Sequence, residues 1–382
     1  MGIDVNEHKR IQTLDVIRGF AVFGIFLVNW PSLTGIETLD GTKTYVGIDA
    51  CIRLIYDLFI QTKFYTIFSF LFGLGFFIFV TNAIEKTQYP RLLFFRRLAF
   101  LFLFGALHYV LLWSGDILHS YAISGMFLLL FYKRRPKTIL IWAILLLTLF
   151  QLLMLLVFIF IDTSVSTVHE IKGMNPLQHW TEQTADRWKR FSGENIALNL
   201  LYVPETLGLF LLGLFAGKIR LFHRVKEWNK PLRRLQIAAF LLTLPSWYMI
   251  LHYYAYTDVY NSAEIYIYIL LSGKTLFVLY TITLARLMQH KAWQRILQPL
   301  QYTGRMALTN YLTQTIGTVV LFGLLAPNSP KLPLLAGLVF CMALYSLQIF
   351  WSKWWLSRFQ YGPFEYVWRL GTYGKKAKHR QA

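Results

Sequence analysis

Charged residues are scarce in this chain of 382 residues, because Asp, Glu, Lys and Arg together make up only 15% of it. Soluble globular domains carry about 25% charged residues, so the composition excludes that class. Cysteine is nearly absent as well. Cys51 and Cys341 show neither C-x-x-C nor metal-ligand spacing, so we expect no disulfide framework and no metal site. The chain lacks a P-loop and a dinucleotide fingerprint, and the Gly-Leu-Gly at 73–75 indicates close helix packing instead.

Apolar residues fill the sequence instead, at 56%. They form runs of about 20 residues from one end of the chain to the other, which is the length that an α-helix needs to cross a bilayer. The pattern predicts an all-α, polytopic transmembrane helical bundle that forms a single domain over residues 1–382. We expect ten spans, at 16–33, 57–80, 97–113, 117–132, 138–161, 201–217, 235–254, 263–285, 306–326 and 332–351.

Acidic residues are the scarcer charged class, since 19 Asp and Glu stand against 38 Lys and Arg, a net charge of +19. With the N-terminus in the cytoplasm, the segments inside hold 29 of the basic residues and those outside only 7. Positively charged loops stay in the cytoplasm, so we expect both termini there. The same bias explains the net charge without a nucleic-acid partner, and the lipid bilayer is the expected partner of the protein. The basic loops mainly determine topology, and anionic lipid or a polyanionic ligand is the alternative role for them.

Two segments outside the spans have a pattern of their own. The outer loop 162–200 places Trp180, Thr184, Trp188 and Phe191 at helical spacing. This pattern predicts an interfacial amphipathic helix, which either covers an outward-facing site as a lid or simply anchors the loop. Residues 352–382 are predicted as a basic cytoplasmic tail.

Polar side chains at membrane depth usually face a cavity or a partner. Asn29, His108 and Lys274 each lie 11 or 12 residues from the nearest arginine at the inner end of the same span. At 1.5 Å per residue all three are about 16–18 Å deep, near the middle of a hydrocarbon core of about 30 Å. We therefore expect them to share one water-accessible pocket.

The string FGALHYVLLWSGDILHSYAISG predicts two antiparallel spans joined by a very short outer turn. His108 lies before the turn, Asp116 in it, and His119 and Tyr121 after it. If all of it is helical, about 12 Å separates His108 from Asp116, so His119 or Tyr121 is the alternative partner of the carboxylate. His108 is either a proton acceptor, the usual role of an imidazole at neutral pH, or a buried histidine bonded to a neighbouring hydroxyl or carbonyl.

Other charged residues allow both a structural and a functional interpretation. Asp15 and Arg18, one helical turn apart, either cap the first span and snorkel to the interface or face a cavity. Lys274 is a candidate counter-ion, proton-relay group or phosphate contact. Glu205 pairs with it only if its helix dips inward. We assign Asp15, His119 and Glu205 to the polar cavity without a chemical role.

Six blocks of the sequence resemble the YeiB-type family of bacterial membrane proteins, which is catalogued as a domain of unknown function. They occur in the family's order over nearly the whole chain, and are RIQTLDVIRGFAVFGIFLVN at 10–29, KFYTIFSFLFGLG at 63–75, HYVLLWSGDIL at 108–118, GLFLLGLFAGKIRLF at 208–222, GRMALTNYLTQT at 304–315 and GPFEYVWRLGTYG at 362–374. The resemblance implies a multi-pass protein of the bacterial cytoplasmic membrane.

The first span of this family is similar to that of two groups of transmembrane acyltransferases, the acyltransferase-3 family and the lysosomal heparan-glucosaminide acetyltransferase. Acyltransferase-3 proteins carry an Arg and, after ten further residues, a His. Here Arg18 is followed at that spacing by Asn29, as in the heparan-type enzymes. Those enzymes take their His from the outer loop eleven residues on, where this chain has Asp40. Arg97 and His108 repeat the Arg-ten-His spacing on a later span.

Together these features favour an acyltransferase that moves an acyl group from cytoplasmic acyl-CoA or acetyl-CoA to a small-molecule or glycan acceptor at the outer face. Such an enzyme needs a cationic vestibule for phosphates, a base within the membrane and a donor to the oxyanion. A transporter or permease is the alternative, and a homodimer is left open. The candidate catalytic residues are His108, Asn29, Asp116 and Tyr121, and the candidate donor-binding residues are Arg18, Arg97, Lys274 and Arg305.

Overall fold

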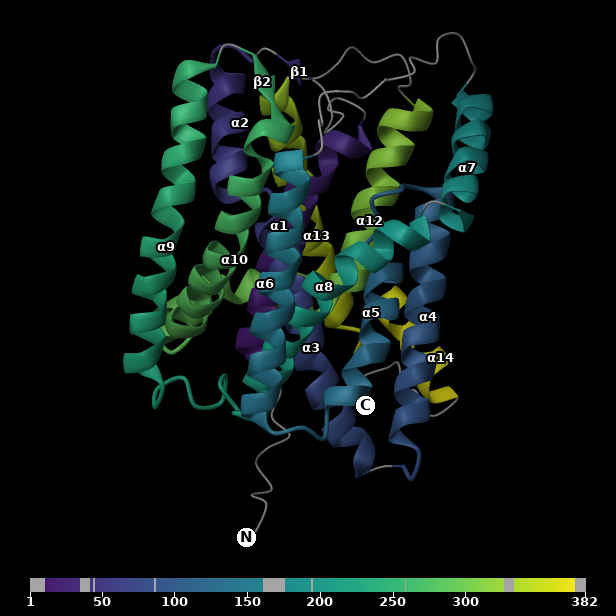
Figure 1. Cartoon of the computed structure of the whole chain (residues 1–382). Helices are drawn as coiled ribbons and strands as arrows, with labels where there is room; N and C mark the ends of the chain where they lie inside the picture. Colours follow the sequence, from purple (N-terminus) through teal and green to yellow (C-terminus); the bar gives the residue numbers. More distant parts are fainter. Residues whose placement is uncertain are drawn as a thin grey trace.

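The computed structural model describes residues 11–34, 42–43, 45–85, 87–160, 176–193, 195–257, 259–325 and 333–374. These residues form a bundle of long helices, which confirms the all-α polytopic architecture (Figure 1). Strands β1 (Thr42–Lys43) and β2 (Tyr260–Asn261) add one short antiparallel ribbon. The helices are α1 (Gln12–Leu33), α2 (Ile48–Phe59), α3 (Lys63–Ile84), α4 (Pro90–Leu111), α5 (Leu118–Phe131), α6 (Pro136–Phe160), α7 (Pro176–Ser192), α8 (Asn195–Lys218), α9 (Asn229–Tyr256), α10 (Ser262–Leu287), α11 (Lys291–Arg305), α12 (Ala307–Thr318), the π-helix η2 (Val319–Leu325), α13 (Leu334–Leu356) and α14 (Pro363–Tyr373).

Within the described residues, eight segments are long and apolar enough to cross a membrane. They are α1, the run of α2 and α3, α4, α6, α8, α9, α10 and α13. The shorter apolar helix α5, and α12 continued by η2, occupy the two remaining predicted positions. Each of the ten predicted spans therefore falls on a helix.

The segment predicted as one continuous span at 57–80 differs from the structure in where it begins and in its continuity. Its helical run begins earlier, at Ile48, and breaks at Thr62, whose φ of 66° lies in the left-handed region. Gln61, Thr62 and Lys63 place three polar residues together, and the Thr62 hydroxyl donates to the Ile269 carbonyl across the bundle at 2.8 Å. This hydrogen bond holds the break between α2 and α3.

The bundle has two ends, which we name the α14 face and the α7 face (Figure 1). The α14 face holds α14, the start of α1 and the loops that follow α3, α5 and α8. The α7 face holds α7, the β1–β2 ribbon and the start of α2. Both described ends of the chain therefore lie on the same side.

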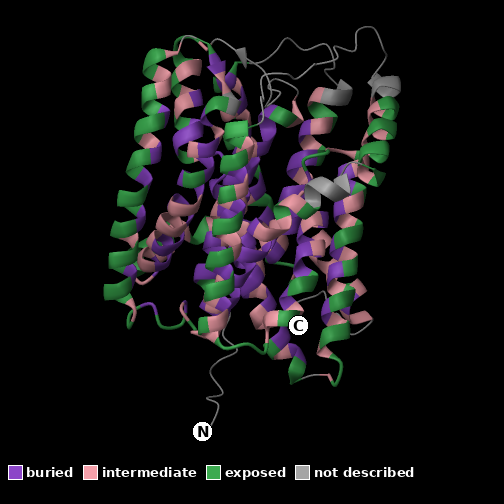
Figure 2. Ribbon diagram, in the orientation of Figure 1, coloured by how far each residue is buried: buried purple, intermediate pink, exposed green. Residues whose placement is uncertain are grey.

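The outer helices turn apolar side chains away from the bundle. Only 11% of an 18-residue apolar stretch of α6 is buried, against 61% of such a stretch of α1. Figure 2 shows the exposed residues along the outer helices. Leucine, isoleucine and phenylalanine dominate this exposed surface. An apolar belt of this size fits a lipid environment.

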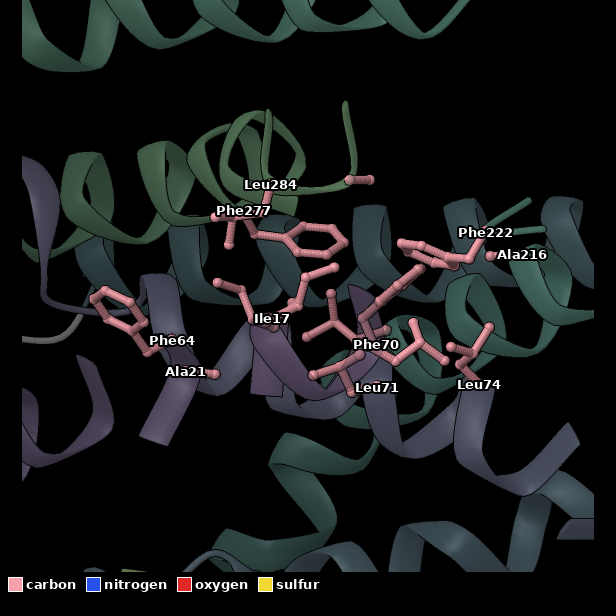
Figure 3. Packing of buried hydrophobic residues seen from close by; sticks show 14 of the residues in the cluster. Ile17, Ala21, Phe64, Phe70, Leu71, Leu74, Ala216, Phe222, Phe277 and Leu284 are labelled. Carbon is pink, nitrogen blue, oxygen red and sulfur yellow. The ribbon is translucent and has the colours of Figure 1, made fainter. Parts of the chain in front are cut away.

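The interior packs around α1, α3, α8 and α10. Ile17 of α1, Phe70 and Leu71 of α3 and Phe277 of α10 meet in the main cluster of buried apolar side chains (Figure 3). Gly73 allows α3 and α8 to touch, because a Cβ there would lie 1.8 Å from the Phe210 carbonyl oxygen. This close approach confirms the predicted helix packing at the first glycine of Gly-Leu-Gly.

Candidate functional site

A cavity of about 640 Å³ enters the bundle from the α14 face. The exposed residues Thr81, Glu85 and Arg220 lie at its mouth, and the buried residues Tyr121 and Tyr311 line its inner part. Helices α1, α3, α4, α5, α12 and α14 all contribute to its wall. The cavity is thus built by segments from the whole length of the chain.

Helix α3 follows the cavity for most of its length. The lining residues run from Phe68 on α3 to Glu85, the residue just after its end, which are 17 residues apart, or about 26 Å along a helix. A hydrocarbon core is about 30 Å thick, so the cavity reaches far into the membrane region. Its inner walls are aromatic and aliphatic, with Phe72, Phe76 and Leu101 among them.

Arginine is the prevailing charged residue of the cavity. Two arginines come from the spans α1 and α4 and three from segments at the α14 face. They are Arg18, Arg97, Arg220, Arg305 and Arg369. The carboxylates that line the cavity are Asp15, Glu85 and Glu365, so positive charge is in excess. Asp15 is already bonded to Arg18, at 2.8 Å.

Glu365 is engaged by the start of α12. Its carboxylate accepts hydrogen bonds from the backbone N–H groups of Leu308 and Thr309, at 2.7 and 3.0 Å, and from the Thr309 hydroxyl at 2.5 Å. Burial raises the pKa of the Glu365 carboxyl, and these hydrogen bonds oppose the shift. Glu365 therefore fixes α14 to α12 and is bonded to no arginine among the described residues.

Arg97 and Arg369 are held by aromatic rings and meet no carboxylate within the described part of the chain. The Arg97 guanidinium lies 3.7 Å from the centre of the Trp368 ring, and that of Arg369 lies 4.2 Å from the centre of the Tyr361 ring. The Nε of Arg369 is buried and has no hydrogen-bond partner there. Two cations stacked on aromatics, with donors to spare, suit an anionic ligand.

Beyond Tyr311 lies a buried group of two histidines and one carboxylate. Asp116 accepts from His108 Nδ1 at 2.9 Å and from His119 Nδ1 at 3.0 Å. It also accepts from the backbone N–H groups of Leu118 and His119, at 2.9 and 3.1 Å. Asp116 therefore caps α5 and holds both imidazoles at once.

The direct contact between His108 and Asp116 corrects the predicted separation of about 12 Å. Helix α4 ends at Leu111, and the N–H groups of both Leu112 and Trp113 bond to the His108 carbonyl. The turn that follows folds back over the helix end. Gly105 makes room for it, because a Cβ there would lie 2.8 Å from Asp116 Oδ2. Of the alternative partners, His119 also bonds to Asp116, whereas the Tyr121 hydroxyl bonds to Ser69.

His108 has the arrangement of a base. The Asp116 carboxylate accepts hydrogen bonds, so the proton of a neutral His108 lies on Nδ1 and the Nε2 lone pair is free. Nε2 is buried and has no hydrogen-bond partner among the described residues. The rings of His108 and Tyr311 are 5.2 Å apart, and the Tyr311 hydroxyl donates to Asp116 at 3.4 Å. His108 does not line the cavity itself. Tyr311 connects the cavity to the His108–Asp116 pair, because it lines the one and contacts the other.

Lys274 belongs to a different cluster, which corrects the expectation of one shared pocket. Its ammonium forms an ion pair with Glu205 and donates to the Tyr65 hydroxyl at 3.0 Å, and Tyr65 donates to Glu205 at 2.6 Å. Helix α8 begins at Asn195 rather than near residue 201, so Glu205 lies ten residues inside it. Glu205 therefore lies far enough along α8 to pair with Lys274, which is the condition that the sequence interpretation set for this ion pair.

The remaining predicted residues divide between the cavity and its surroundings. Arg18, Arg305 and Asp15 line the cavity, as does Tyr121, whose hydroxyl donates to the Tyr65 carbonyl at 2.9 Å. Asn29 is buried on α1 and is not part of the cavity wall. Of the cationic candidates, Lys274 alone lies outside the cavity wall.

Helix α7 covers the end of α4 at the α7 face. Trp180 and Arg187 donate to the Leu111 carbonyl, at 3.0 and 3.2 Å, and Arg187 also donates to that of Val110 at 2.9 Å. The Phe191 ring lies 5.5 Å from that of His119. Trp180 and Phe191 of the predicted stripe thus pack on the hairpin, whereas Trp188 is 59% exposed.

The sequence interpretation missed the contribution of the chain's last helix. The predicted tail at 352–382 contains the end of α13 and all of α14, which supplies Trp368 and Arg369 to the cavity; residues 375–382 lie outside the described part. Pro363 at the helix start and Gly374 just after its end are ordinary signals for a helix. Tyr311 carried no charge and so escaped attention.

Comparison with known proteins supports the resemblance noted from the sequence. Residues 216–375 match the family described as "Protein of unknown function (DUF418)". The chain is 34% identical to "Uncharacterized protein YxaH" of Bacillus subtilis, over 96% of this chain and 95% of that protein. It is 31% identical to the "Uncharacterized 39.9 kDa protein in amylase 3'region" of Bacillus acidopullulyticus and 26% identical to "Uncharacterized protein YeiB" of Escherichia coli, at similar coverage. The chain therefore belongs to the YeiB-type DUF418 family.

Proposed function

We propose that this protein is an acyltransferase of the bacterial cytoplasmic membrane that uses acyl-CoA, with acetyl-CoA as the smallest donor. The acceptor is a hydroxyl or amine of a small molecule or glycan at the outer face. The cavity is the observation that supports this most directly, because it joins five arginines at one end to Tyr311 and the His108–Asp116 pair at the other.

The charge distribution indicates which face of the bundle lies in the cytoplasm. Basic loops face the cytoplasm, which puts the α14 face and the cavity mouth on the side where acyl-CoA is made. The phosphates of CoA would meet Arg97 and Arg369, whose guanidinium groups have no carboxylate partner within the described residues. Guanidinium groups bind phosphate oxygens through charge-assisted hydrogen bonds.

The chemistry follows from the free Nε2 of His108. It accepts the proton of the acceptor hydroxyl or amine while the acceptor atom attacks the thioester carbonyl. The tetrahedral intermediate collapses, the C–S bond breaks, and the CoA thiolate takes the proton from Nε2. Asp116 holds the imidazole through Nδ1 and balances its charge during the step.

Tyr311 is the group we assign to the oxyanion in place of Asn29. Its side chain lines the cavity and its hydroxyl lies 3.4 Å from Asp116 Oδ1. The backbone of Ile117 also hydrogen-bonds to the Tyr311 hydroxyl. The hydroxyl proton is engaged only by the long hydrogen bond to Asp116, so it is available for donation to a developing negative charge. Asn29 is not part of the cavity wall.

The proposal is tested with the protein in proteoliposomes or nanodiscs. CoA should bind in a saturable and salt-sensitive way, and Arg97→Gln should weaken binding about tenfold, because one charge-assisted phosphate contact contributes about 1.5 kcal/mol or more. Titration calorimetry with CoA measures this directly. Arg190→Gln is the matched control, since Arg190 is exposed on α7 and lies outside the cavity wall.

Turnover completes the test. With labelled acetyl-CoA outside inside-out vesicles, and bacterial envelope extract trapped within, free thiol and labelled product should appear together. Absence of saturable CoA binding by the wild-type protein would refute the donor. Binding without thiol release would refute the acyltransferase and leave a transporter or permease.

A further inference from the structure

Gly75 occupies a special position on the cavity wall. It lies on α3 between Phe72 and Phe76, and no other part of the described chain comes within 4 Å of the place where its Cβ would be. Gly73, two residues earlier, has the Phe210 carbonyl oxygen 1.8 Å from that place. The two glycines of one Gly-Leu-Gly string therefore differ: the first brings helices together, and the second leaves the cavity open.

Gly75 lies farther from the α14 face than the guanidinium groups of Arg97 and Arg369. The Arg97 guanidinium lies 5.1 Å from the centre of the Phe79 ring, and Phe79 is one helical turn nearer to the α14 face on α3 than Gly75. The Tyr373 ring lies 6.2 Å from that of Phe79 and 5.0 Å from the Arg369 guanidinium, which places Arg369 at the same level. The remaining cavity arginines lie on α1, α11 and the loop after α8.

The part of the cavity beyond Gly75 has a different character. Its lining includes the apolar residues Phe68, Leu71 and Ile117, with the hydroxyl groups of Tyr121 and Tyr311. A multiply charged phosphate group is stable beside the arginines and costly to move past them. Only the uncharged part of an anionic amphiphile fits beyond this level.

We infer that Gly75 sets the bore of the cavity, and that the uncharged, unbranched arm of an anionic donor passes beside it to reach Tyr311. The inference rests on the proposed function, where the arm is acyl-pantetheine. Gly75 is thus a specificity-determining residue: the missing side chain admits a linear arm and keeps the nucleotide at the arginines.

Substitution at Gly75 separates the two ends of the donor. Gly75→Leu should lower thiol release from acetyl-CoA about tenfold or more, because the arm no longer brings the thioester to its reacting position. Binding of the nucleotide part of CoA alone should stay within about twofold, since its contacts lie outside the bore. Gly317→Leu is the control: this glycine of α12 has only Leu344 within 4 Å of its Cβ position and lies outside the cavity wall.

A labelling experiment tests the position without turnover. In a Cys51→Ser background, Gly75→Cys should react with the anionic, membrane-impermeant reagent sulfonatoethyl methanethiosulfonate, and CoA should slow this reaction. Gly317→Cys should show no CoA protection. Native Cys341 is fully buried and serves as the internal blank.

The outcomes distinguish the inference from the proposed function. No reaction at Gly75→Cys in a folded protein would overturn the open bore. Reaction that CoA does not slow, in a protein that binds CoA, would place the arm elsewhere and overturn the inference alone. Reaction in a protein that does not bind CoA would refute the proposed donor and, with it, the assignment of the arm.

Discussion

Replacing His108 with alanine should lower thiol release from acyl-CoA by about 10²–10⁴-fold, which is the usual contribution of a positioned general base. His108 provides the Nε2 lone pair, and the hydrogen bond from Nδ1 to Asp116 fixes the tautomer that leaves this lone pair unprotonated. CoA binding should be unchanged, because His108 does not line the cavity. Single-turnover thiol release and calorimetric titration separate the two effects.

The control for this variant is His252→Ala, since His252 lies exposed on α9 among tyrosine rings. Thermal unfolding of both variants checks that the hairpin persists without the His108 side chain. Thiol release at the wild-type rate in a folded His108→Ala protein would remove His108 from the mechanism and leave Tyr311 without a base beside it.

Replacing Lys274 with methionine should destabilise the fold by about 3–5 kcal/mol, because it leaves the buried Glu205 carboxylate without its cation. Glu205 is 2% exposed, and Tyr65 is its remaining hydrogen-bond donor among the bonds to its side chain in the described structure. Denaturant-induced unfolding in a mild detergent measures the loss. CoA binding should not change, because Lys274 lies outside the cavity wall.

The double variant decides whether the pair is structural. Lys274→Met combined with Glu205→Gln should recover most of the lost stability, because the neutral amide still accepts from Tyr65 and no charge remains unpaired. A double variant as unstable as the single one would contradict the ion-pair explanation. A single variant that binds CoA tenfold more weakly would return Lys274 to the donor site.

A count of residues along a span gives an expected depth in the membrane, but it gives no lateral position. Counting residues along each span places Asn29, His108 and Lys274 at one level, yet it does not tell which way each helix faces. In the structure His108 contacts the α5 start and Lys274 contacts α8 and α3. Rotation and neighbours depend on packing between distant segments, which one sequence does not specify.

Local geometry explains the other differences between the sequence predictions and the structure. The pairing of His108 with Asp116 depends on where α4 ends, and helix ends are the least predictable part of a helix. At 73–75 the sequence is Gly-Leu-Gly, and the two glycines differ only because α8 touches one of them. Helix α14 is not predicted when long apolar runs are the criterion. Its 11 residues are too few for a membrane span and lie within the predicted basic tail.

Asp116 has one further consequence, for how variants of this protein are selected. The same carboxylate starts α5, through two backbone N–H groups, and holds the imidazole of His108. A random library screened only for membrane insertion and yield will already retain this residue. Any variant that keeps the folded hairpin therefore also keeps the orientation of the His108 imidazole. Directed evolution toward a new acceptor can leave Asp116 unchanged.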